Sequence, residues 1–337
     1  MSKLTIRDIA KMAKVSPATV SLVMNERKGI SDATRARVKA ILAETGFTPN
    51  VHTRRLMLRK SSTIHIVLRQ RKTPSHNLFG FEVLMGIFSE SRKVGYDVKC
   101  LTVDAANDYS QIMEAVHAGD SDGAIFVQAY NSSVCDLLTA ENFPFICIDS
   151  HLRPDNKVPY MDEDHYTTAY NATKYLIQMG HNDIALITSE DSSEYFSRTF
   201  TGYTDALRDH ELICRPEWIQ KGADAEIPSP QCIRNLISCK HRPTAVFCAG
   251  DFLAMEAIKQ IRLSGLRVPD DFSIIGNDDL LVTEYIDPPL TTMAFDKQNM
   301  GAEAVRTLFK IINHEPYEQG TKLPTHLVER GTVRKVN

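Results

Sequence analysis

The sequence predicts an N-terminal all-α helix-turn-helix head, followed by an α/β body of two doubly wound parallel-sheet lobes. Residues 1–60 carry 13 Lys or Arg and 4 Asp or Glu, a net charge of +9, whereas the whole chain carries −3 and the remainder therefore −12. Such a basic segment suggests a nucleic-acid-binding module, with a solvated basic surface as the alternative. Beyond residue 60, short apolar runs alternate with helical stretches, and about 277 residues suffice for two lobes.

The first two helices of the predicted head lie close together in the sequence. Thr5 is an N-cap residue, and Asp8 three positions further on complements the exposed amides and the helix dipole. Ser16 is a second N-cap, and Pro17 begins a helix over residues 17–25, where proline loses no hydrogen bond. The short turn between them predicts a helix-turn-helix. The apolar faces are formed by Ile6, Ile9, Ala10 and Ala13 in the first helix and by Val20, Val23 and Met24 in the second.

A third helix completes the head, which we expect over residues 1–46. Ser31 caps this helix, Asp32 lies in its first turn, and Gly46 ends it. Its inner face is formed by Val38, Ile41 and Leu42. A small helical domain without a ligand is the alternative, but the caps, the short turn and the basic charge together favour DNA binding.

The helix-turn-helix predicts which residues contact DNA. The second helix of such a motif enters the major groove by its N-terminal residues, while hydroxyl and basic side chains of its neighbours bind phosphates. The residues expected near base edges are Pro17, Ala18, Ser21 and Leu22. Those expected near the phosphate backbone are Thr5, Ser16, Thr19, Asn25, Ser31 and Thr34.

Residues 47–61 form a candidate hinge between the head and the body. This segment is too apolar for a passive linker and too basic to pack inside a domain. It is therefore expected to fold on DNA, with arginines on phosphates and a leucine inserted into the minor groove, although a solvated tether is the alternative. The candidate contact residues are Asn50, Arg54, Arg55 and Leu56.

The body contains seven apolar runs that we expect to be strands. Continuous apolar runs in strand, helix, strand order imply parallel sheets covered on both faces. Such sheets bind ligands at the carboxyl ends of their strands. The runs are residues 64–68, 96–103, 123–128, 143–149, 184–188, 245–250 and 272–276.

Polar residues follow several of these runs. Asp149 ends one apolar run, Asp251 directly follows another, and the pair Asp278 and Asp279 follows a third after Asn277. Arg198 is expected in the loop after another strand. An ordinary helix cap or loop carboxylate is the alternative for each aspartate alone, but their repetition at one edge favours a polar cleft. Carboxylates together with an arginine suit a hydroxyl-rich ligand, because vicinal hydroxyls need fixed acceptors and a planar donor.

The sequence resembles the lactose-repressor (LacI/GalR) family of bacterial transcription regulators. In the head, the resemblance lies in TIRDIAKMAKVSPATVSLVMN and ISDATRARVKAILAETGFTPN. In the body it continues, in the family's order, through LMGIFSESRKVGYDV, PFICID, YLIQMGHNDIALIT, GLRVPDDFSIIGNDD, PPLTTM and MGAEAVRTLF. These segments span nearly the whole chain.

The resemblance implies a repressor that binds a double-stranded DNA operator as a homodimer and responds to a small-molecule effector, a sugar or related metabolite. It implies a periplasmic-binding-protein-like core over residues 62–337, with an N-lobe of about 62–160 plus 293–324 and a C-lobe of about 161–292 plus 325–337. The effector pocket implied between the lobes is lined by Asn77, Leu78, Phe79, Asp149, Arg198, Asp251 and Asp278.

Several positions depart from the family pattern. Leu22 stands where many relatives carry a long polar reader, so thymine methyl groups and DNA deformability are expected to carry more of the discrimination. Gly250 replaces the asparagine often found before Asp251, and Asn277 replaces the usual aromatic before Asp278, which indicates either an unusual effector or a lost effector site. Trp218 is expected in the core.

Other classes of protein lack support in the sequence. Seven cysteines without a C-x-x-C pair indicate buried free thiols in a reducing cytosol, and no metal site, cofactor motif or catalytic residue is recognised. No signal peptide or run of ~20 apolar residues is found, so a cytoplasmic protein is expected. A periplasmic sugar-binding protein needs export and lacks a basic head, and a sugar-converting enzyme needs a nucleophile, metal or cofactor.

Overall fold

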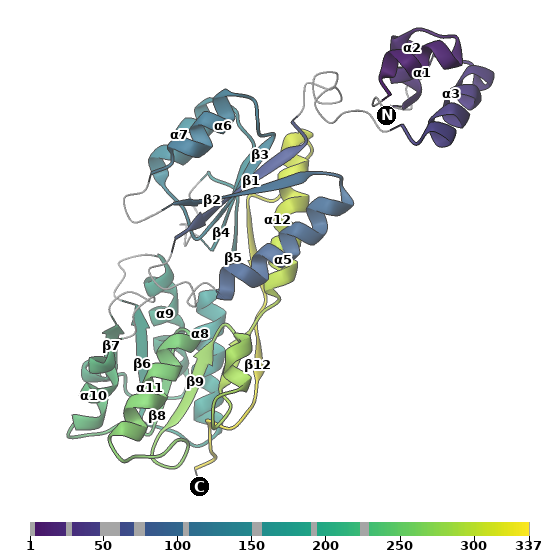
Figure 1. The fold of residues 1–337 in the computed structure, drawn as a ribbon. Helices are drawn as coiled ribbons and strands as arrows, with labels where there is room; N and C mark the ends of the chain where they lie inside the picture. Colours follow the sequence, from purple (N-terminus) through teal and green to yellow (C-terminus); the bar gives the residue numbers. More distant parts are fainter. Residues whose placement is uncertain are drawn as a thin grey trace. The chain divides into compact units, whose positions relative to one another are not determined.

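The computed structural model describes residues 4–24, 29–47, 61–70, 78–103, 108–149, 157–189, 194–222 and 229–336. The chain divides into two compact units, residues 1–61 and 62–337. Figure 1 shows the helices of the first unit and the two α/β lobes of the second.

Among its described residues, the first unit contains three short helices, α1 (Ile6–Ala13), α2 (Pro17–Met24) and α3 (Asp32–Thr45). The predicted caps are confirmed. Thr5 and Asp8 form a reciprocal capping box at α1, Ser31 accepts a hydrogen bond at the start of α3, and Gly46 ends α3 in the left-handed region. Lys14, also left-handed, makes the turn between α1 and α2. The core of the unit is formed by Ile9, Ala10, Ala13, Val20, Val23 and Val38, all buried as predicted.

The N-lobe is built on a six-stranded sheet in the order β11-β5-β4-β3-β1-β2, in which every neighbouring pair is parallel. Helices cover both faces, α5 and α12 on one and α6 and α7 on the other (Figure 1). The strands are β1 (Thr63–Arg69), β2 (Asp97–Val103), β3 (Gly123–Val127), β4 (Phe145–Ile148), β5 (Tyr160–Glu163) and β11 (Gly320–Leu323). The helices are α5 (Leu78–Lys93), α6 (Ser110–His117), α7 (Ser132–Ala140) and α12 (Lys297–Ile312).

The C-lobe is built on a second six-stranded sheet in the order β12-β10-β9-β8-β6-β7, parallel except for the antiparallel edge strand β12. Its strands are β6 (Ile184–Ser189), β7 (Ile219–Gly222), β8 (Ala245–Cys248), β9 (Ser273–Asn277), β10 (Thr291–Ala294) and β12 (His326–Val328). Its helices are α8 (His165–Gln178), α9 (Glu194–Asp209), α10 (Pro230–Ser238) and α11 (Asp251–Leu263), with the 3-10 turns η2 (Pro216–Trp218) and η3 (Leu281–Glu284).

All seven predicted strands are present, but five further strands were not predicted: β5, β7, β10, β11 and β12. Each is only three or four residues long, and all contain polar side chains, so they lack the apolar signal of a buried strand. The expectation of burial on both faces is wrong for β2, which lies at a sheet edge and exposes Lys99, Cys100 and Thr102. An edge strand pairs with a strand on one side only and is more open to solvent, so polar residues are tolerated there.

The chain passes between the lobes three times. It crosses from β5 to α8 after Glu163, from β10 to α12 after Ala294, and from β11 to β12 after Leu323. The lobe limits implied by the resemblance, at 160/161 and 292/293, fall inside β5 and β10, whereas strand pairing keeps each of these strands whole. The three crossings bring residues of both lobes to one junction.

Two further expectations concern the interior. Trp218 is buried and its indole N–H donates to the carbonyl of His241 at 2.9 Å, so the core position is confirmed. The cysteines are free, and four of them, Cys135, Cys147, Cys232 and Cys248, are buried. Within the described ranges, no helix combines the length and the apolar composition that a membrane span needs.

Candidate DNA-contact surface and interlobe site

Helix α2 presents a small apolar face to solvent. Val20 and Val23 are buried against α1 and α3, which turns Pro17, Ala18 and Leu22 outward. Positions separated by four residues share one face of a helix, so these three side chains and the half-buried Ser21 lie together. The Leu22 side chain is 39% exposed, and an exposed leucine gains free energy when a partner removes it from water.

The predicted phosphate-contact hydroxyls sit at the starts of the three helices. The Thr5 hydroxyl donates to Asp8 Oδ2 at 2.6 Å, Ser16 Oγ accepts from the Thr19 amide at 3.0 Å, and Ser31 Oγ accepts from the Thr34 amide at 3.4 Å. The hydrogen bonds from Thr5 lower the pKa of the Asp8 carboxyl. Helix N-termini carry partial positive charge and free amides, so these positions suit an anion such as a phosphate.

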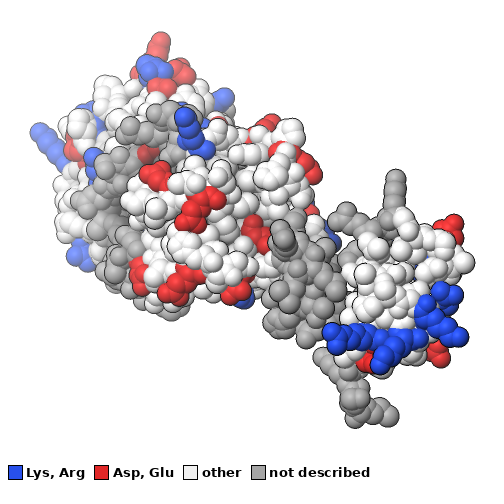
Figure 2. Space-filling view, turned by 90° about the horizontal axis from the view of Figure 1, so that it is seen from above, with Lys and Arg blue, Asp and Glu red and all other residues white. Residues whose placement is uncertain are grey.

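Basic side chains gather on the same unit. Figure 2 shows the lysines and arginines of the head together along one side. The basic residues described there are Arg7, Lys11, Lys14, Arg35, Arg37 and Lys39. The predicted contact residues Asn25, Asn50, Arg54, Arg55 and Leu56, and the predicted pocket residue Asn77, lie outside the described residues.

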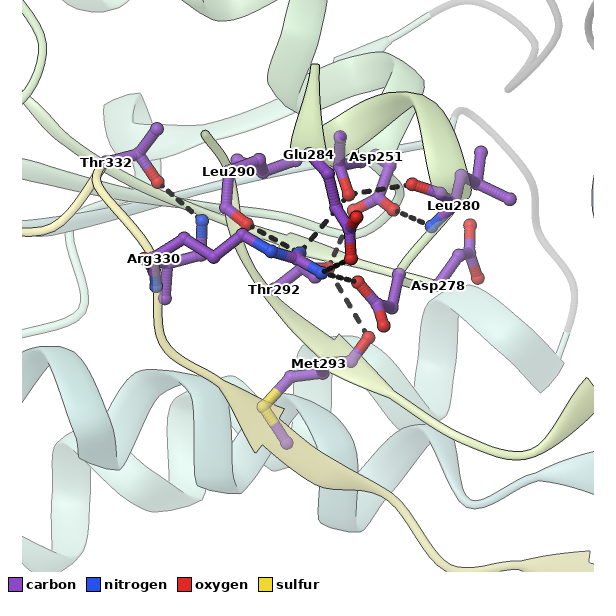
Figure 3. A network of polar contacts seen from close by, with 12 residues as sticks. Asp251, Asp278, Leu280, Glu284, Leu290, Thr292, Met293, Arg330 and Thr332 are labelled. Carbon is purple, nitrogen blue, oxygen red and sulfur yellow. Dashed lines mark hydrogen bonds and ion pairs between the residues drawn. The ribbon is translucent and has the colours of Figure 1, made fainter. Parts of the chain in front are cut away.

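In the second unit, Asp251 lies at the start of α11 and is fully buried. Its Oδ2 accepts from the Leu280 amide and its Oδ1 from the Thr292 hydroxyl, each at 2.7 Å (Figure 3). Burial raises the pKa of Asp251 to about 7, against the lowering effect of these two hydrogen bonds. Both carboxylate oxygens of Asp251 thus accept hydrogen bonds from the protein. These bonds connect the loop after β9, through Leu280, to β10, through Thr292.

The loop after β9 carries Asp278 and Asp279 in the positive-φ region, with φ of 110° and 51°. Arg330 pairs with Asp279 at 2.7 Å, and Lys297 donates to the backbone carbonyl of Asp278. Burial, together with the charges of Asp251 and Glu163, raises the pKa of Asp278 well above its usual range. Lys297 therefore holds the backbone of this loop and Arg330 holds its Asp279 side chain, while the charges near the Asp278 carboxyl group are those of other carboxylates.

On the N-lobe side, Asp149 directly follows β4 and has a φ of 48°. Its Oδ2 accepts from the side-chain amide of Gln128, which follows the neighbouring strand β3. Phe79 is almost buried and packs against Phe295 with ring centroids 6.0 Å apart, and Leu78 packs against the same cluster. Both predicted pocket residues of α5 thus contribute to the N-lobe core.

Glu163, the last residue of β5, meets Asn277, the last residue of β9. Both are buried, and Asn277 Nδ2 donates to Glu163 Oε2 at 3.1 Å. His165 Nδ1 lies 3.8 Å from the same Glu163 oxygen, and the His165 ring packs edge-on against Tyr195 at 4.7 Å. Although burial opposes ionisation of both groups, their mutual attraction lowers the pKa of Glu163 and raises that of His165.

Tyr195 packs against His165 and donates its phenol hydrogen to the backbone carbonyl of Ala249. Burial, together with the charges of Asp278, Glu163 and Asp149, raises the pKa of this phenol well above its usual range. We call Asp149, Glu163, His165, Tyr195, Asn277 and Asp278 the interlobe cluster. Two members of this cluster, Asp149 and Asp278, were predicted from the sequence as effector contacts. Asn277 was noted there only as the replacement of an aromatic residue, and Glu163, His165 and Tyr195 were not predicted.

Arg198 does not lie in a loop, so that prediction is wrong. It is the fifth residue of α9, where its Nε lies 3.6 Å from Glu194 Oε1, a pairing that successive helix turns favour. Its charge lowers the pKa of Tyr160, although burial raises that pKa overall.

The interlobe cluster is not arranged as a metal centre. In the part of the chain that the structure describes, no group of three or more His, Cys, Asp or Glu could hold a metal ion. Its acceptors and half-buried carboxylates suit hydrogen-bond donors of an organic ligand instead.

The chain is similar to known proteins along nearly its whole length. Residues 5–50 match the lacI family of bacterial regulatory proteins, and residues 173–333 match a periplasmic binding protein-like domain. The transcriptional repressor PurR of Pasteurella multocida is 31% identical over 98% of both chains, and the ribose operon repressor of Haemophilus influenzae is 32% identical over 92% of both. A solved lac repressor dimer, bound to operator and the anti-inducer ONPF, aligns with 26% identity and a TM-score of 0.78 over 99% of this chain and 100% of that one.

Proposed function

The chain belongs to the LacI family of bacterial regulatory proteins, and on this basis we propose that it is a ligand-responsive transcription repressor that binds a pseudo-palindromic operator as a homodimer. The observation that carries this proposal is the succession, in one chain, of a capped helix-turn-helix and a two-lobed α/β body. The relatives named above are repressors, and the lac repressor dimer was solved with operator.

In the head, we propose that α2 enters the major groove and that the helix starts at Thr5, Ser16 and Ser31 bind phosphates. The exposed apolar face of α2 supports contacts with thymine methyl groups, and the basic side of the head supports attraction to the phosphate backbone. The hinge residues Arg54, Arg55 and Leu56 belong to the same proposal.

Exposed apolar side chains in both lobes support the homodimer. On α5, Phe81, Met85 and Phe88 are exposed at helical spacing, so they form one stripe. In the C-lobe, Leu281 and Tyr285 are exposed, and a groove is lined by Met255, Ile258, Leu263 and Ile286 together with Lys259, Arg262 and Asp287. Exposed apolar side chains suit an interaction surface, and a twofold dimer buries the same surface on both subunits.

We propose that the effector binds between the lobes at the interlobe cluster, with Asp149 and Asp278 as direct contacts. Binding there biases the relative orientation of the lobes, which changes the spacing of the two hinges and couples effector to operator. The absence of a recognised catalytic motif supports a binding rather than an enzymatic role, and a DNA target supports a cytoplasmic location.

The proposal is tested by selecting binding sites for the full-length protein from a random DNA library, followed by a metabolite screen. We expect enrichment of a pseudo-palindrome with two half-sites, and at least one sugar or nucleoside that raises the melting temperature and changes operator affinity. Failure to enrich any sequence, or ligand binding that leaves operator affinity unchanged, contradicts it.

A further inference from the structure

We propose that the effector of this chain carries a positively charged amino group, which binds the Glu163–Asn277 pair at the lobe junction. This inference rests on the proposed function, because it assumes an effector bound at the interlobe cluster. It adds the chemical class of the ligand and two residues that select it.

Two buried acceptors at this pair lack hydrogen-bond partners. The second carboxylate oxygen of Glu163, Oε1, and the side-chain carbonyl oxygen of Asn277, Oδ1, accept no hydrogen bond from any described residue. Both residues are at least 95% buried, and their other polar atoms are bound to each other. Buried acceptors are almost always satisfied in native proteins, so two on adjacent groups indicate donors from a ligand.

The position of the pair supports a ligand rather than a local defect. Glu163 and Asn277 are the last residues of β5 and β9, strands that belong to the parallel sheets of different lobes. The carboxyl ends of parallel strands are where α/β sheets bind ligands. A group that contacts both residues contacts both lobes, as the coupling of effector to lobe orientation requires.

The charge around the pair favours a cation over a neutral polyol. Asp278 accepts from the side-chain amide of Asn277 at 3.4 Å, which is a neutral donor. The nearby cations have other partners: Lys297 binds the carbonyl of Asp278 and lies 3.5 Å from Glu82, and Arg330 pairs with Asp279 and Glu284. His165, when protonated, balances one negative charge of the cluster at most.

An alkylammonium group matches this arrangement. It offers three N–H donors and one positive charge, and charge-assisted hydrogen bonds are stronger than neutral ones. Two donors satisfy Glu163 Oε1 and Asn277 Oδ1, and the third is available to the adjacent carboxyl group of Asp278, whose ionised form a bound cation favours. A hydroxyl in the same position offers a single donor, so it leaves one acceptor unsatisfied and the charge uncompensated.

The experiment uses matched ligands that differ by one group. Thermal shift and operator affinity of the full-length protein are measured with glucosamine, galactosamine and putrescine, each beside its hydroxyl counterpart glucose, galactose or 1,4-butanediol. N-acetylglucosamine and N-acetylgalactosamine retain the ring but remove the charge. We expect at least one amine to raise the melting temperature, with its hydroxyl and N-acetyl counterparts at least ten-fold weaker.

Variants then assign the effect to the pair. Glu163→Gln keeps the acceptor for Asn277 but removes the charge, and we expect it to weaken amine binding at least ten-fold while hydroxyl compounds are unaffected. Glu141→Gln, an exposed carboxylate on the N-lobe surface, is the matched control and should bind as the parent does. Should Glu163→Gln fail to fold, the matched ligand pairs with the parent protein decide alone.

Equal responses to both members of every pair, including no response to either, overturn the proposal. A neutral compound that shifts both melting temperature and operator affinity overturns it while leaving the repressor function intact. Loss of operator selection in the same samples marks a failure of the proposed function instead.

Discussion

Asn277 Nδ2 donates to Glu163 Oε2 over 3.1 Å, a hydrogen bond that joins the final residue of β9 in the C-lobe to the final residue of β5 in the N-lobe. The two residues are 114 positions apart in the sequence. Because both are buried, a rotation of one lobe against the other must break or strain this bond. The lobe junction is thus a polar contact that a ligand can reinforce or replace.

The electrostatic part of DNA binding is measured by its salt dependence. We expect log affinity to fall with log salt concentration by roughly 0.9 per phosphate contact, because each contact releases condensed counterions. Arg54→Ala should lower this slope by about 0.9 and weaken specific and non-specific binding alike. Fluorescence anisotropy over a range of salt concentrations provides the measurement, and a flat response contradicts it.

The exposed apolar face of α2 predicts contacts with thymine methyl groups. Replacement of operator thymines by uracil removes only that methyl, so binding should weaken at one or two positions per half-site where Ala18 or Leu22 lies against it. The expected loss is of the order of 1 kcal/mol per position. Leu22→Ala should abolish the discrimination at its own position, whereas tolerance of uracil everywhere contradicts the assignment.

Asp149 and Asp278 are predicted to contact the effector directly. Asparagine at either position keeps the size of the side chain but replaces the carboxyl group by an amide that cannot ionise, so the ligand response should weaken by roughly ten-fold, or about 1.4 kcal/mol. Operator affinity without ligand should stay close to that of the parent protein. Parallel ligand and operator titrations measure both quantities, and equal losses of both indicate that these aspartates hold the fold together.

Asp251 predicts a specific dependence of stability on pH. Its pKa is raised from 3.8 to about 7 by burial, so the folded state binds the proton more tightly than the unfolded chain does. The stabilisation that protonated Asp251 provides is fully present below pH 3.8 and is lost as the pH rises through about 7. The free energy of unfolding should fall by a few kcal/mol, on the order of 1.4 kcal/mol for each pH unit between the unfolded and the folded pKa of Asp251.

Asp251→Asn tests this dependence, since the amide that it introduces resembles the protonated acid. That amide can donate to the Thr292 hydroxyl, which in turn lies 3.3 Å from the carbonyl of Met293. Urea unfolding at several pH values should therefore show a smaller decline between pH 3.8 and about 7 than in the parent. Asp136→Asn, an exposed change on α7, serves as control. An unchanged decline in Asp251→Asn shows that another group is responsible.

The sequence allowed accurate prediction where the signal is local. The caps at Thr5, Ser31 and Gly46 depend on a few neighbouring residues, and the strands with continuous apolar runs depend on burial alone. The short strands β5 and β10 were not predicted because their sequences, YMDE and TTMA, are too short or too polar to be distinguished from loop sequences. Only pairing with neighbours far along the chain makes them strands.

Only part of the interlobe cluster was named from the sequence, because only some of its residues carry a local sequence signal. Asp149 and Asp278 follow apolar runs and were found by that position, whereas Glu163 ends a strand without an apolar signal. The contact of Glu163 with Asn277 depends on how two sheets are packed, which no local pattern encodes. Arg198 was assigned to a loop, whereas it is the fifth residue of α9.

We expect effector binding and operator binding to be coupled in this chain. Operator affinity measured with and without saturating effector, and effector affinity measured with and without operator, should change by the same factor, because coupling between two sites is reciprocal. We expect a factor of at least about five in both titrations, or about 1 kcal/mol. Identical operator affinities with and without a bound effector would contradict the account.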